Sequence, residues 1–575
     1  MDHFANPSRR LTLPVFWLFV VLFATTEPAR ADDGALLTTP PAKPLRLPAE
    51  FEPMQAVIHY PGIELTNLYR NLTEDVRLIV PWRTNSEYES ARRSLVETGA
   101  NLDNCEFYQV AYRTMERDGM PWFLFTDHNE PAFVYNQRET DSWPLPQYGL
   151  AQGYHVYRSG LSVEGGHFIT DGQGTAVSLD NVAFDHADMG DEFMQRVRDF
   201  WGIHTYHFIA NAGGSYEYMH IDCLAKFLTP DTIMVARVPS SFTLYERTEN
   251  AAAYFRRQVS YYGTAYRVVR VDAPNREPYI NSLIVNRRIY VPIMGRDPDA
   301  AALASYEAAM PGYEVIGVRY GPEGVKSAWS PFIALHCITM GIADEQMLYI
   351  QHVPLLDRPP TAHGFPIAAK IVAHSCTPFI EDTPAVLWRA LADANETQPP
   401  APWNAIPMAP TPELGDHQHL AHIPAQPTGT VIQYYLQARD ASGRNEAHPY
   451  IGAPQAHTFM VTTLGANVSA VSAQRGGTIE IYMNAGLDNA QQDYRLTYSL
   501  CADPNLPEGL PVALPDTTVL AGFDGTLDDF GTGIAQMILA EPLTSDWVGR
   551  FFRFSLELDN QQSTVPDTVR VQILE

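Results

Sequence analysis

The chain has 575 residues, of which 45% are hydrophobic and 18% are charged, and its formal net charge is -27. These proportions are ordinary for a globular protein and exclude a disordered or fibrous chain. The negative charge argues against nucleic acid as a partner and favours cationic substrates, although solubility alone also accounts for it. The length suggests about three or four domains.

The first 31 residues have the pattern of a secretory signal peptide. An arginine pair precedes the apolar stretch of residues 11–24, and a small-x-small sequence, Ala29-Arg30-Ala31, follows it. The apolar stretch is short for a membrane span. We therefore expect a cleaved signal peptide over residues 1–31 and a secreted or periplasmic mature chain without a membrane span. An uncleaved anchor is the alternative.

Short apolar runs alternate with helical patterns from residue 51 to about residue 355. Strands are expected at residues 76–81, 175–179, 232–238, 266–271 and 288–291. Helices are expected at residues 86–98, 191–200, 222–227, 251–262 and 299–310. This alternation predicts an α/β domain. Its large size favours repeated units arranged in a ring, although no repeat is visible in the sequence itself.

The texture of the sequence changes at about residue 359, where proline and short β-type runs begin to dominate. Strands are expected at residues 431–438, 458–463, 478–483, 494–500 and 551–558. Such material suits two β-sandwiches, the first of them Ig-like. The predicted division is a signal peptide (1–31), an α/β domain (32–358), an Ig-like domain (359–465) and a C-terminal β-sandwich domain (466–575).

The chain has five cysteines: Cys105, Cys223, Cys337, Cys376 and Cys501. An exported protein with so few cysteines, odd in number and widely spaced, is not a disulfide scaffold. At least one thiol is left over, and in an oxidising compartment such a thiol needs burial or a chemical role.

Five short polar motifs follow one another through the α/β domain. They are Arg117-Asp118 before the apolar run at Trp122, Glu164-Gly165-Gly166-His167, His220-Ile221-Asp222, Asn281-Ser282-Leu283, and His336-Cys337 at the end of an apolar run. Each motif alone has a structural reading, such as a cap, a hairpin or a buried thiol. If a strand runs through His220, then His220 and Asp222 share one face of it, which places an imidazole and a carboxylate at one site.

In order and wording, the motifs resemble those of the bacterial peptidylarginine deiminase and agmatine deiminase family, one of the guanidino-group-modifying families. The resemblance covers roughly residues 50 to 350. Residues 434–449 also resemble the Ig-like domain that follows the catalytic domain in the secreted peptidyl branch. The resemblance implies a five-bladed, pentein-like α/β propeller as the deiminase catalytic domain, followed by the two β-sandwich domains.

The resemblance also implies a role for each motif. Cys337 would be the nucleophile, His220 the general acid and base, Asp118 and Asp222 the carboxylates that bind the guanidinium, and Asn281 a support near the nucleophile. The implied substrate-binding residues further include Trp122, Arg138, Gly165, Gly166 and His167. A guanidinium is planar and permanently charged, so each carboxylate can accept two of its N–H bonds.

The implied reaction is hydrolysis of peptidyl-arginine to citrulline and ammonia through a covalent cysteine thiouronium, without a metal or an organic cofactor. The histidines of residues 417–422 and the acids of residues 524–529 are interpreted as a solvated β-edge and an acidic turn rather than as metal sites. The expected partners are arginine-containing peptides or proteins, or small guanidino compounds.

Several positions depart from the family pattern. Met115 and Met120 replace a tryptophan and a glycine of the first motif, and His167 replaces an asparagine. Arg138 lies beside Glu139 where the peptidyl branch has two arginines that hold a terminal carboxylate. These departures leave two alternatives open: a deiminase of agmatine or another small guanidine, and an inactive protein that binds arginine peptides.

Overall fold

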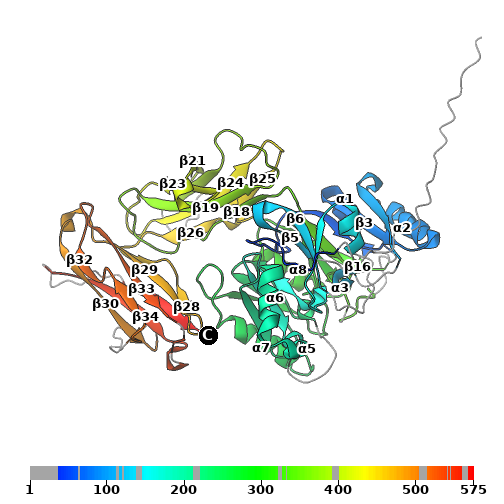
Figure 1. Ribbon diagram of the computed structural model, residues 1–575, viewed down its shortest axis with the longest axis horizontal. Helices are drawn as coiled ribbons and strands as arrows, with labels where there is room; N and C mark the ends of the chain where they lie inside the picture. Colours follow the sequence, from blue (N-terminus) through cyan, green and yellow to red (C-terminus); the bar gives the residue numbers. More distant parts are fainter. Residues whose placement is uncertain are drawn as a thin grey trace, which may run out of the picture.

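The computed structural model describes most of the chain (Figure 1). The described residues are 36–61, 65–111, 116–119, 122–136, 146–211, 220–321, 327–331, 333–391, 401–503, 514–540, 542–543, 545–559 and 568–575. The predicted signal peptide lies outside them. Within these residues, no helix combines the length and the apolar character needed to cross a membrane.

The first part of the described chain contains five small sheets. Their strand orders are β17-β1-β3-β4, β5-β6-β7, β8-β9-β10, β11-β12-β13 and β14-β15-β16-β2. The strands are β1 (Met54–Ile58), β2 (Leu65–Thr66), β3 (Arg77–Trp82), β4 (Cys105–Gln109), β5 (Trp122–Phe125), β6 (Pro131–Tyr135), β7 (His155–Arg158), β8 (Ile169–Thr170), β9 (Thr175–Leu179), β10 (Thr205–Ile209), β11 (Ala225–Thr229), β12 (Thr232–Arg237), β13 (Arg267–Asp272), β14 (Leu283–Val285), β15 (Arg288–Ile293), β16 (Glu314–Tyr320) and β17 (Met340–Ala343).

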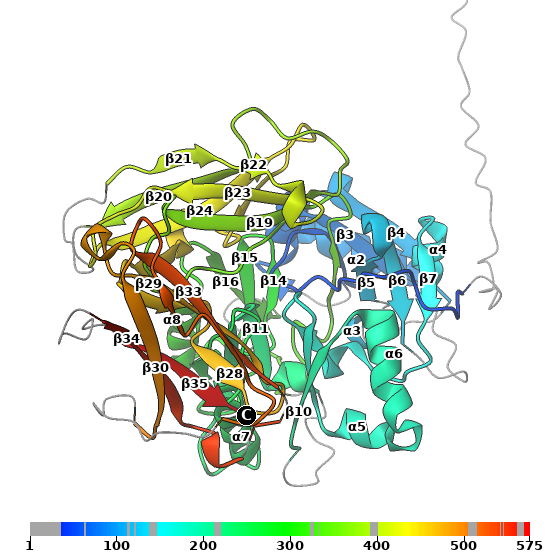
Figure 2. The same ribbon diagram turned by 60° about the vertical axis from the view of Figure 1, so that its left-hand side comes forward.

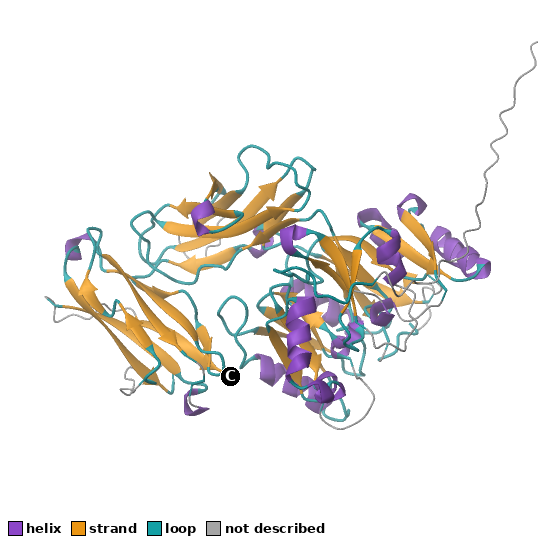
Figure 3. Ribbon diagram, viewed as in Figure 1, coloured by secondary structure: helices purple, strands orange, loops and turns teal. Residues whose placement is uncertain are grey.

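Helices and short 3-10 turns connect these strands. The α-helices are α1 (Tyr69–Asp75), α2 (Asn85–Glu97), α3 (Glu116–Gly119), α4 (Pro146–Ala151), α5 (Asn181–Asp185), α6 (Asp191–Trp201), α7 (Tyr245–Phe255) and α8 (Pro298–Ala309). The 3-10 turns are η2 (Leu102–Asn104), η3 (Asp127–Asn129), η4 (Gly165–His167), η5 (Ala187–Met189) and η6 (Ile221–Cys223). Figure 3 shows that the helices gather in this part of the molecule.

All five sheets are built on one unit. In each, a first strand pairs antiparallel with a second, and the second pairs parallel with a third. Parallel neighbours need a crossover, and helices supply it, for example α7 between β12 and β13 and α8 between β15 and β16. In the sheet β17-β1-β3-β4, the antiparallel pair is formed by β17 and β1. The last strand of the first part of the chain therefore pairs with its first strand. The structure therefore contains an internal ββαβ repeat that the sequence does not display.

Most of the secondary structure expected in this part is confirmed, with one informative error. The predicted strands match β3, β9, β12, β13 and β15, and the predicted helices match α2, α6 and α8, whereas α7 begins earlier than expected. The helix predicted at residues 222–227 is wrong, because the chain forms η6 and then strand β11. The first four residues of β11 are all buried. A short, fully buried apolar run has no periodicity that separates strand from helix.

The remainder of the described chain is almost entirely β-structure. Residues 348–460 form the sheets β18-β19-β23-β22 and β21-β20-β24-β25, with β26 paired to β24, and residues 464–574 form β27-β29-β33-β31 and β28-β35-β34-β30-β32. The strands are β18 (Leu348–Gln351), β19 (Phe365–Ala373), β20 (Ala385–Leu391), β21 (Asn404–Pro407), β22 (Ala409–Pro410), β23 (Gln418–Ile423), β24 (Val431–Arg439), β25 (Asn445–His448), β26 (His457–Met460), β27 (Leu464–Ala466), β28 (Ala470–Ser472), β29 (Gly477–Asn484), β30 (Asp493–Cys501), β31 (Val519–Ala521), β32 (Asp524–Thr526), β33 (Thr532–Leu539), β34 (Phe551–Leu558) and β35 (Thr568–Leu574). The turns are η7 (Pro412–Leu414), η8 (Ala453–Gln455), η9 (Leu487–Asn489) and η10 (Ser545–Trp547).

Each of these two β-groups has its own apolar core. Strand β24 alternates buried and half-buried residues, as a strand with one face toward a core does. One cluster of buried side chains runs through residues 348–461 and another through residues 464–573. Figure 2 shows the two groups beside the first part, with β19 to β24 above it. The groups begin at β18 and β27, slightly before the predicted boundaries at residues 359 and 466.

Asp299 ties the start of α8 to the segment that leads into β14. Its carboxylate accepts hydrogen bonds from the backbone N–H groups of Met294 (3.0 Å), Gly295 (2.6 Å) and Arg296 (2.9 Å). It also accepts one from the hydroxyl of Tyr279 (2.7 Å), which is fully buried. One carboxylate therefore satisfies four donors and fixes the backbone that approaches Asn281.

Replacement of this carboxylate tests its structural weight. Asp299→Ala should lower the free energy of unfolding by about 3 kcal/mol, because buried donors then lack an acceptor. Asp299→Asn keeps one acceptor oxygen and should cost less. Calorimetric unfolding of both variants provides the measurement. The control is Asp297→Ala, which removes an exposed carboxylate that caps nothing in α8. Equal effects of Asp297→Ala and Asp299→Ala would contradict the assignment.

Candidate active site

The five polar motifs occupy equivalent places in the five structural units. Each ends directly before the first strand of a unit: α3 before β5, η4 before β8, η6 before β11, Asn281 before β14, and Cys337 before β17. Long-range contacts link neighbouring members, as between α3 and η4 and between η4 and η6. The repeat of the fold thus brings together side chains that lie far apart in the sequence.

Asn281 holds Cys337, the predicted nucleophile. The amide oxygen of Asn281 accepts hydrogen bonds from the backbone N–H groups of His336 (3.0 Å) and Cys337 (3.3 Å). Its amide nitrogen lies 3.3 Å from Sγ of Cys337, and Oδ2 of Asp222 lies 3.6 Å from the same sulfur. Cys337 is only 4% exposed. The thiol is therefore fixed in position beside a carboxylate in a nearly dry environment.

Asp222 presents one free oxygen at this site. Its Oδ2 lies 2.7 Å from Nδ1 of His336, whereas Oδ1 has no hydrogen-bond partner among the described residues. Burial alone would raise the pKa of this fully buried carboxyl. The hydrogen bond to His336 and the charges of His336, His220 and Arg117 outweigh burial and hold the pKa well below its usual range. An ionised, half-satisfied carboxylate is a strong acceptor for a cationic N–H group.

A buried chain of charges supports Asp222 from behind. Nε2 of His336 lies 2.6 Å from Oε2 of Glu50, and Nζ of Lys226 donates to both oxygens of Glu50 at 2.9 and 2.8 Å. Both ring nitrogens of His336 therefore face carboxylate oxygens at hydrogen-bond distance. Burial would raise the pKa of Glu50, but Lys226 and His336 hold it well below its ordinary value.

A small cavity of about 90 Å³ lies next to this chain, lined by Glu50, Lys226, His336, Arg117 and Trp122 among others. Nε of Arg117 donates to the carbonyl oxygen of His336 at 3.1 Å, and its Nη2 is buried without a hydrogen-bond partner among the described residues. The cavity has room for a few water molecules, which can satisfy such a donor.

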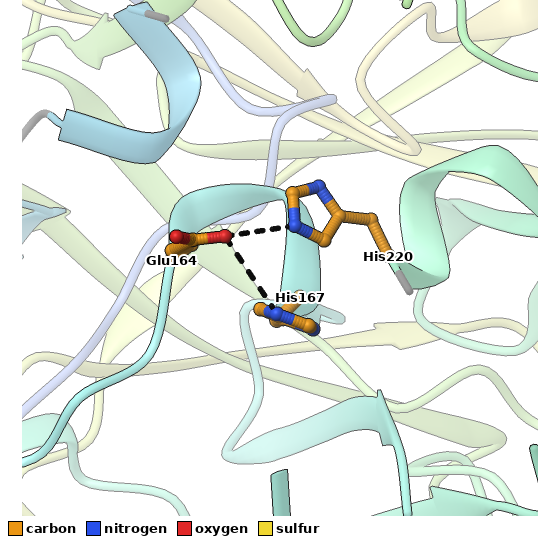
Figure 4. Close-up of side chains that lie close together, drawn as sticks. All are labelled: Glu164, His167 and His220. Atoms are coloured by element: carbon orange, nitrogen blue, oxygen red, sulfur yellow. Dashed lines mark hydrogen bonds and ion pairs between the residues drawn. The ribbon is translucent and has the colours of Figure 1, made fainter. Parts of the chain in front are cut away.

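His220, the predicted acid and base, contacts carboxylates on two sides. Its Nε2 lies 2.9 Å from Oε2 of Glu164, and its Nδ1 lies 3.8 Å from Oδ1 of Asp118. Figure 4 shows the carboxylate of Glu164 facing both His220 and His167, whose Nε2 lies 3.8 Å from Glu164. Oδ1 of Asp118 accepts a hydrogen bond from the backbone N–H of Gly166 at 3.1 Å.

The carboxylates set the protonation of this group. Burial alone would lower the pKa of His220, but the Glu164 hydrogen bond and the charges of Asp222, Asp118 and Glu164 raise it to about 9. Burial raises the pKa of Asp118 to about 6, against the lowering effect of the His220 charge. Near neutral pH the site therefore contains a protonated His220 and an ionised Asp118.

The paired glycines of η4 allow this close packing. A Cβ atom on Gly166 would lie 2.3 Å from Nδ1 of His220, and one on Gly165 would lie 2.0 Å from the carbonyl oxygen of Arg117. Real side chains do not approach that closely, so any other residue would displace His220 or α3. The resemblance implied a substrate-binding role for these glycines, and in the structure Gly166 packs against the predicted acid and base.

Other predicted site residues are placed differently or not described. His220 does not lie on a strand, so the alternation argument for His220 and Asp222 is wrong; the two instead flank Ile221 at η6. Trp122 packs against Phe168, with ring centroids 4.2 Å apart, and against Trp201. Arg138 lies outside the described residues, as do Met115, Met120 and Glu139.

Sequence reasoning missed Glu50, Glu164 and Lys226. Glu164 directly precedes the glycine pair, so its position beside a predicted site was a usable signal. Glu50 and Lys226 carried no such signal, because Glu50 lies in an extended segment and Lys226 was expected on a helix. His336 belonged to the last motif, but nothing in the sequence indicated that it bridges two carboxylates.

A thiol, an imidazole and several carboxylates in one buried group suit the hydrolysis of a cationic amidine. A family profile matches residues 39–342 and makes this chain a hydrolase that acts on C–N bonds in amidines. The matching family is described as Porphyromonas-type peptidyl-arginine deiminase, and the chain belongs to it.

Individual relatives are more distant. A Vibrio parahaemolyticus protein named as a candidate agmatine deiminase is 22% identical over 338 residues, which cover 49% of this chain and 94% of the relative. The solved structure of an agmatine deiminase of Enterococcus faecalis is 19% identical, with a TM-score of 0.44, and covers 52% of this chain and 96% of that one. A candidate arginine deiminase from Porphyromonas gingivalis is also 19% identical, with a TM-score of 0.44, and covers 52% of this chain and 99% of that one.

The buried ion pair between Lys226 and Glu50 should be essential for stability. Lys226→Met removes the ammonium and leaves Glu50 buried with less compensation, so the free energy of unfolding should fall by about 3 to 5 kcal/mol. Differential scanning calorimetry measures the change.

The matched control is Lys43→Met. Its ion pair with Asp199 is just as short, at 2.6 Å, but the Lys43 side chain is 54% exposed. An exposed pair contributes little. If Lys226→Met proved no more destabilising than Lys43→Met, the buried chain would not support the site.

Proposed function

We propose that this protein is an exported, cofactor-independent deiminase that hydrolyses the guanidinium of peptidyl-arginine to citrulline and ammonia. The observation that carries the proposal is the position of the Cys337 sulfur, 3.6 Å from Oδ2 of Asp222, a carboxylate whose other oxygen, Oδ1, has no hydrogen-bond partner among the described residues. A nucleophile and an open anionic acceptor lie side by side, as attack on the central carbon of a guanidinium requires. Export is proposed from the pattern of the first 31 residues alone.

In the proposed complex, Asp222 and Asp118 accept the N–H groups of the substrate. The cation supplies positive charge at the unpartnered Oδ1 of Asp222 and is itself held in one plane by the two carboxylates. This orientation directs the central carbon toward Sγ of Cys337. The incoming cation and the protonated His220 stabilise the thiolate form of Cys337 before attack.

The reaction then proceeds in two halves. The thiolate adds to the guanidinium carbon, His220 gives its proton to one nitrogen, and the C–N bond breaks with loss of ammonia. The remaining thiouronium is linked to Cys337. Neutral His220 takes a proton from water, and the hydroxide adds to the same carbon. The C–S bond then breaks, the proton of the added hydroxyl passes to solvent, and the ureido product and the thiolate are released.

We further propose that the five ββαβ sheets are the blades of a pentein-like propeller, closed by the β17 and β1 pair. The equivalent placement of all five motifs supports this arrangement, because residues at one end of every blade would then converge. The two β-groups that follow are proposed as the Ig-like domain (359–465) and the C-terminal β-sandwich domain (466–575).

Two substrate classes compete. The description of the matching family favours peptidyl-arginine. The second candidate is agmatine or another small guanidine, favoured by the Vibrio parahaemolyticus relative, whose name refers to agmatine. Both classes present the same guanidinium to Cys337, so they differ only in what surrounds it.

A direct comparison of substrates tests the proposal. The full chain is incubated with peptides that carry internal or C-terminal arginine and with agmatine, and the ureido product is quantified. We expect the highest kcat/KM with an arginyl peptide. Cys337→Ala should lose at least about 1,000-fold in kcat, because covalent catalysis is removed.

Three other outcomes would contradict the proposal. A preference for agmatine would move the protein to the second candidate class. Turnover that survives Cys337→Ala would refute the covalent mechanism. Tight binding of arginyl peptides without any product, unchanged in Cys337→Ala, would indicate a binding protein.

The pKa values of Asp118 and His220 predict a bell-shaped pH profile. Asp118 loses its charge as the pH falls below about 6, and His220 loses its proton as the pH rises above about 9. The first change weakens guanidinium binding and the second removes the acid for ammonia departure. We therefore expect kcat/KM to fall on both sides of this range.

Glu164→Gln tests whether the alkaline limb reports His220. This variant removes the charge and the ionic hydrogen bond that raise the pKa of His220, so the alkaline limb should move to lower pH. Glu192→Gln, on an exposed pair with Arg196, should leave the profile unchanged. An alkaline limb that stays in place in Glu164→Gln would mean that it does not report His220.

A further inference from the structure

We infer that Cys223 and Cys337 form a reversible disulfide when the protein meets a peroxide, and that this bond switches the enzyme off. The covalent event is a property of the two thiols. Only its effect on activity rests on the proposed function, in which Cys337 is the nucleophile.

The two sulfurs share one buried site. Cys223 ends η6 and is 8% exposed. The sulfurs of Cys223 and Cys337 and a carboxylate oxygen of Asp222 all lie within 4.8 Å of one another. The amide nitrogen of Asn281 contacts both sulfurs, at 3.3 Å from Cys337 and 3.9 Å from Cys223. The second thiol therefore sits beside the reacting atom.

Little movement separates the reduced pair from a disulfide. A disulfide has a sulfur–sulfur distance of about 2 Å, so the two atoms must approach by less than about 3 Å in total. Rotations about the two χ1 angles can supply such a displacement. Both cysteines also lie in short turns, η6 and residues 335–338, rather than inside a strand. The backbone there is not held by a sheet ladder.

The deiminase reaction gives Cys223 no role. Protonation and water activation fall to His220, and the substrate is held by Asp118 and Asp222. Cys223 nevertheless occupies space in direct contact with the site. A thiol at that position matters most in an oxidising compartment, where the export pattern of the sequence would place the chain.

Oxidation of the two thiols by a peroxide proceeds in two steps. The thiolate of Cys337 attacks one oxygen of the peroxide, hydroxide leaves, and a sulfenic acid forms on Cys337. Cys223 then attacks that sulfur, the hydroxyl leaves as water after taking the Cys223 proton, and the sulfur–sulfur bond closes. The two thiols lose two electrons to the peroxide, which becomes two water molecules. A dithiol reductant reverses the last step by exchange.

Protonation restrains Cys223 until Cys337 is oxidised. The pKa of Cys223 is raised well above its ordinary value, first by its hydrogen bond with Cys337, then by burial and by the charge of Asp222. Oxidation of Cys337 adds a hydroxyl to the sulfur that takes part in that hydrogen bond, and this hydroxyl can accept the Cys223 proton as it leaves. The neighbouring position also makes the second step intramolecular, which favours it over further oxidation.

Peptide mapping tests the inference on the full chain. The purified protein is treated with hydrogen peroxide, its remaining thiols are alkylated, and its peptides are analysed by mass spectrometry. We expect a peptide pair linked through Cys223 and Cys337, a parallel loss of deiminase activity, and recovery of both thiols and activity with dithiothreitol. Absence of this linked pair, or linkage of Cys337 to another cysteine, would overturn the inference.

Variants of Cys223 provide the decisive comparison. In Cys223→Ser, the oxidised Cys337 has no partner, so it should proceed to sulfinic acid and dithiothreitol should restore nothing. Cys223→Ala repeats the test in case serine disturbs the site, and thermal unfolding identifies any misfolded variant. Reversible inactivation of both folded variants, equal to that of the parent, would also overturn the inference.

Cys376→Ser is the matched control. Cys376 is exposed in the turn after β19, and its replacement should leave the linked pair and the reversibility as in the parent. The mass measurement does not depend on turnover. A linked pair in a protein without deiminase activity would support the disulfide and refute the proposed function, whereas an active enzyme without the pair would do the reverse.

Discussion

The arrangement depends on one buried histidine that bridges two carboxylates. His336 lies between the carboxylates of Asp222 and Glu50, and Lys226 neutralises the second of them. The two carboxylates can share a dry interior because each of them meets a hydrogen-bonding or cationic partner at hydrogen-bond distance. Without His336, Asp222 would have to take up a proton or leave the interior. Oδ1 of Asp222 would then be unavailable to a cation, and the electrostatic potential at Sγ of Cys337 would change.

This charge balance has a geometric counterpart in the fold. Each motif lies shortly before the first strand of a unit, where the backbone is not yet hydrogen-bonded into a sheet. Side chains at such positions are free to turn toward the neighbouring units, while the strands behind them supply rigidity. The glycine pair of η4 and the amide of Asn281 then set the spacing at the scale of single atoms. The repeat of the fold therefore sets where the motif side chains lie, and a few local contacts set the distances between them.

The motif residues could be predicted from the sequence, but the buried residues that contact them could not. The motif residues could be predicted because their local sequences and their order resemble a known family; they are Asp118, His220, Asp222, Asn281 and Cys337. Glu50 could not, since its partner His336 is 286 residues away and its partner Lys226 is 176 residues away. No local pattern encodes such pairings. The same limit explains the wrong helix prediction at residues 222–227, where a buried apolar run is as compatible with a helix as with a strand until its neighbouring strand β12 is known.

The pairing of β17 with β1 also governs when the site can exist. Cys337 lies at the entrance to β17, and β17 completes a sheet whose other strands were made at the start of the chain. A nascent chain therefore lacks the last strand of this sheet and the sulfur of Cys337 at the same time. Contacts of such long sequence separation form late. The site is therefore assembled only after the whole α/β part has been synthesised, and a chain truncated before β17 would lack both the closing strand and the thiol.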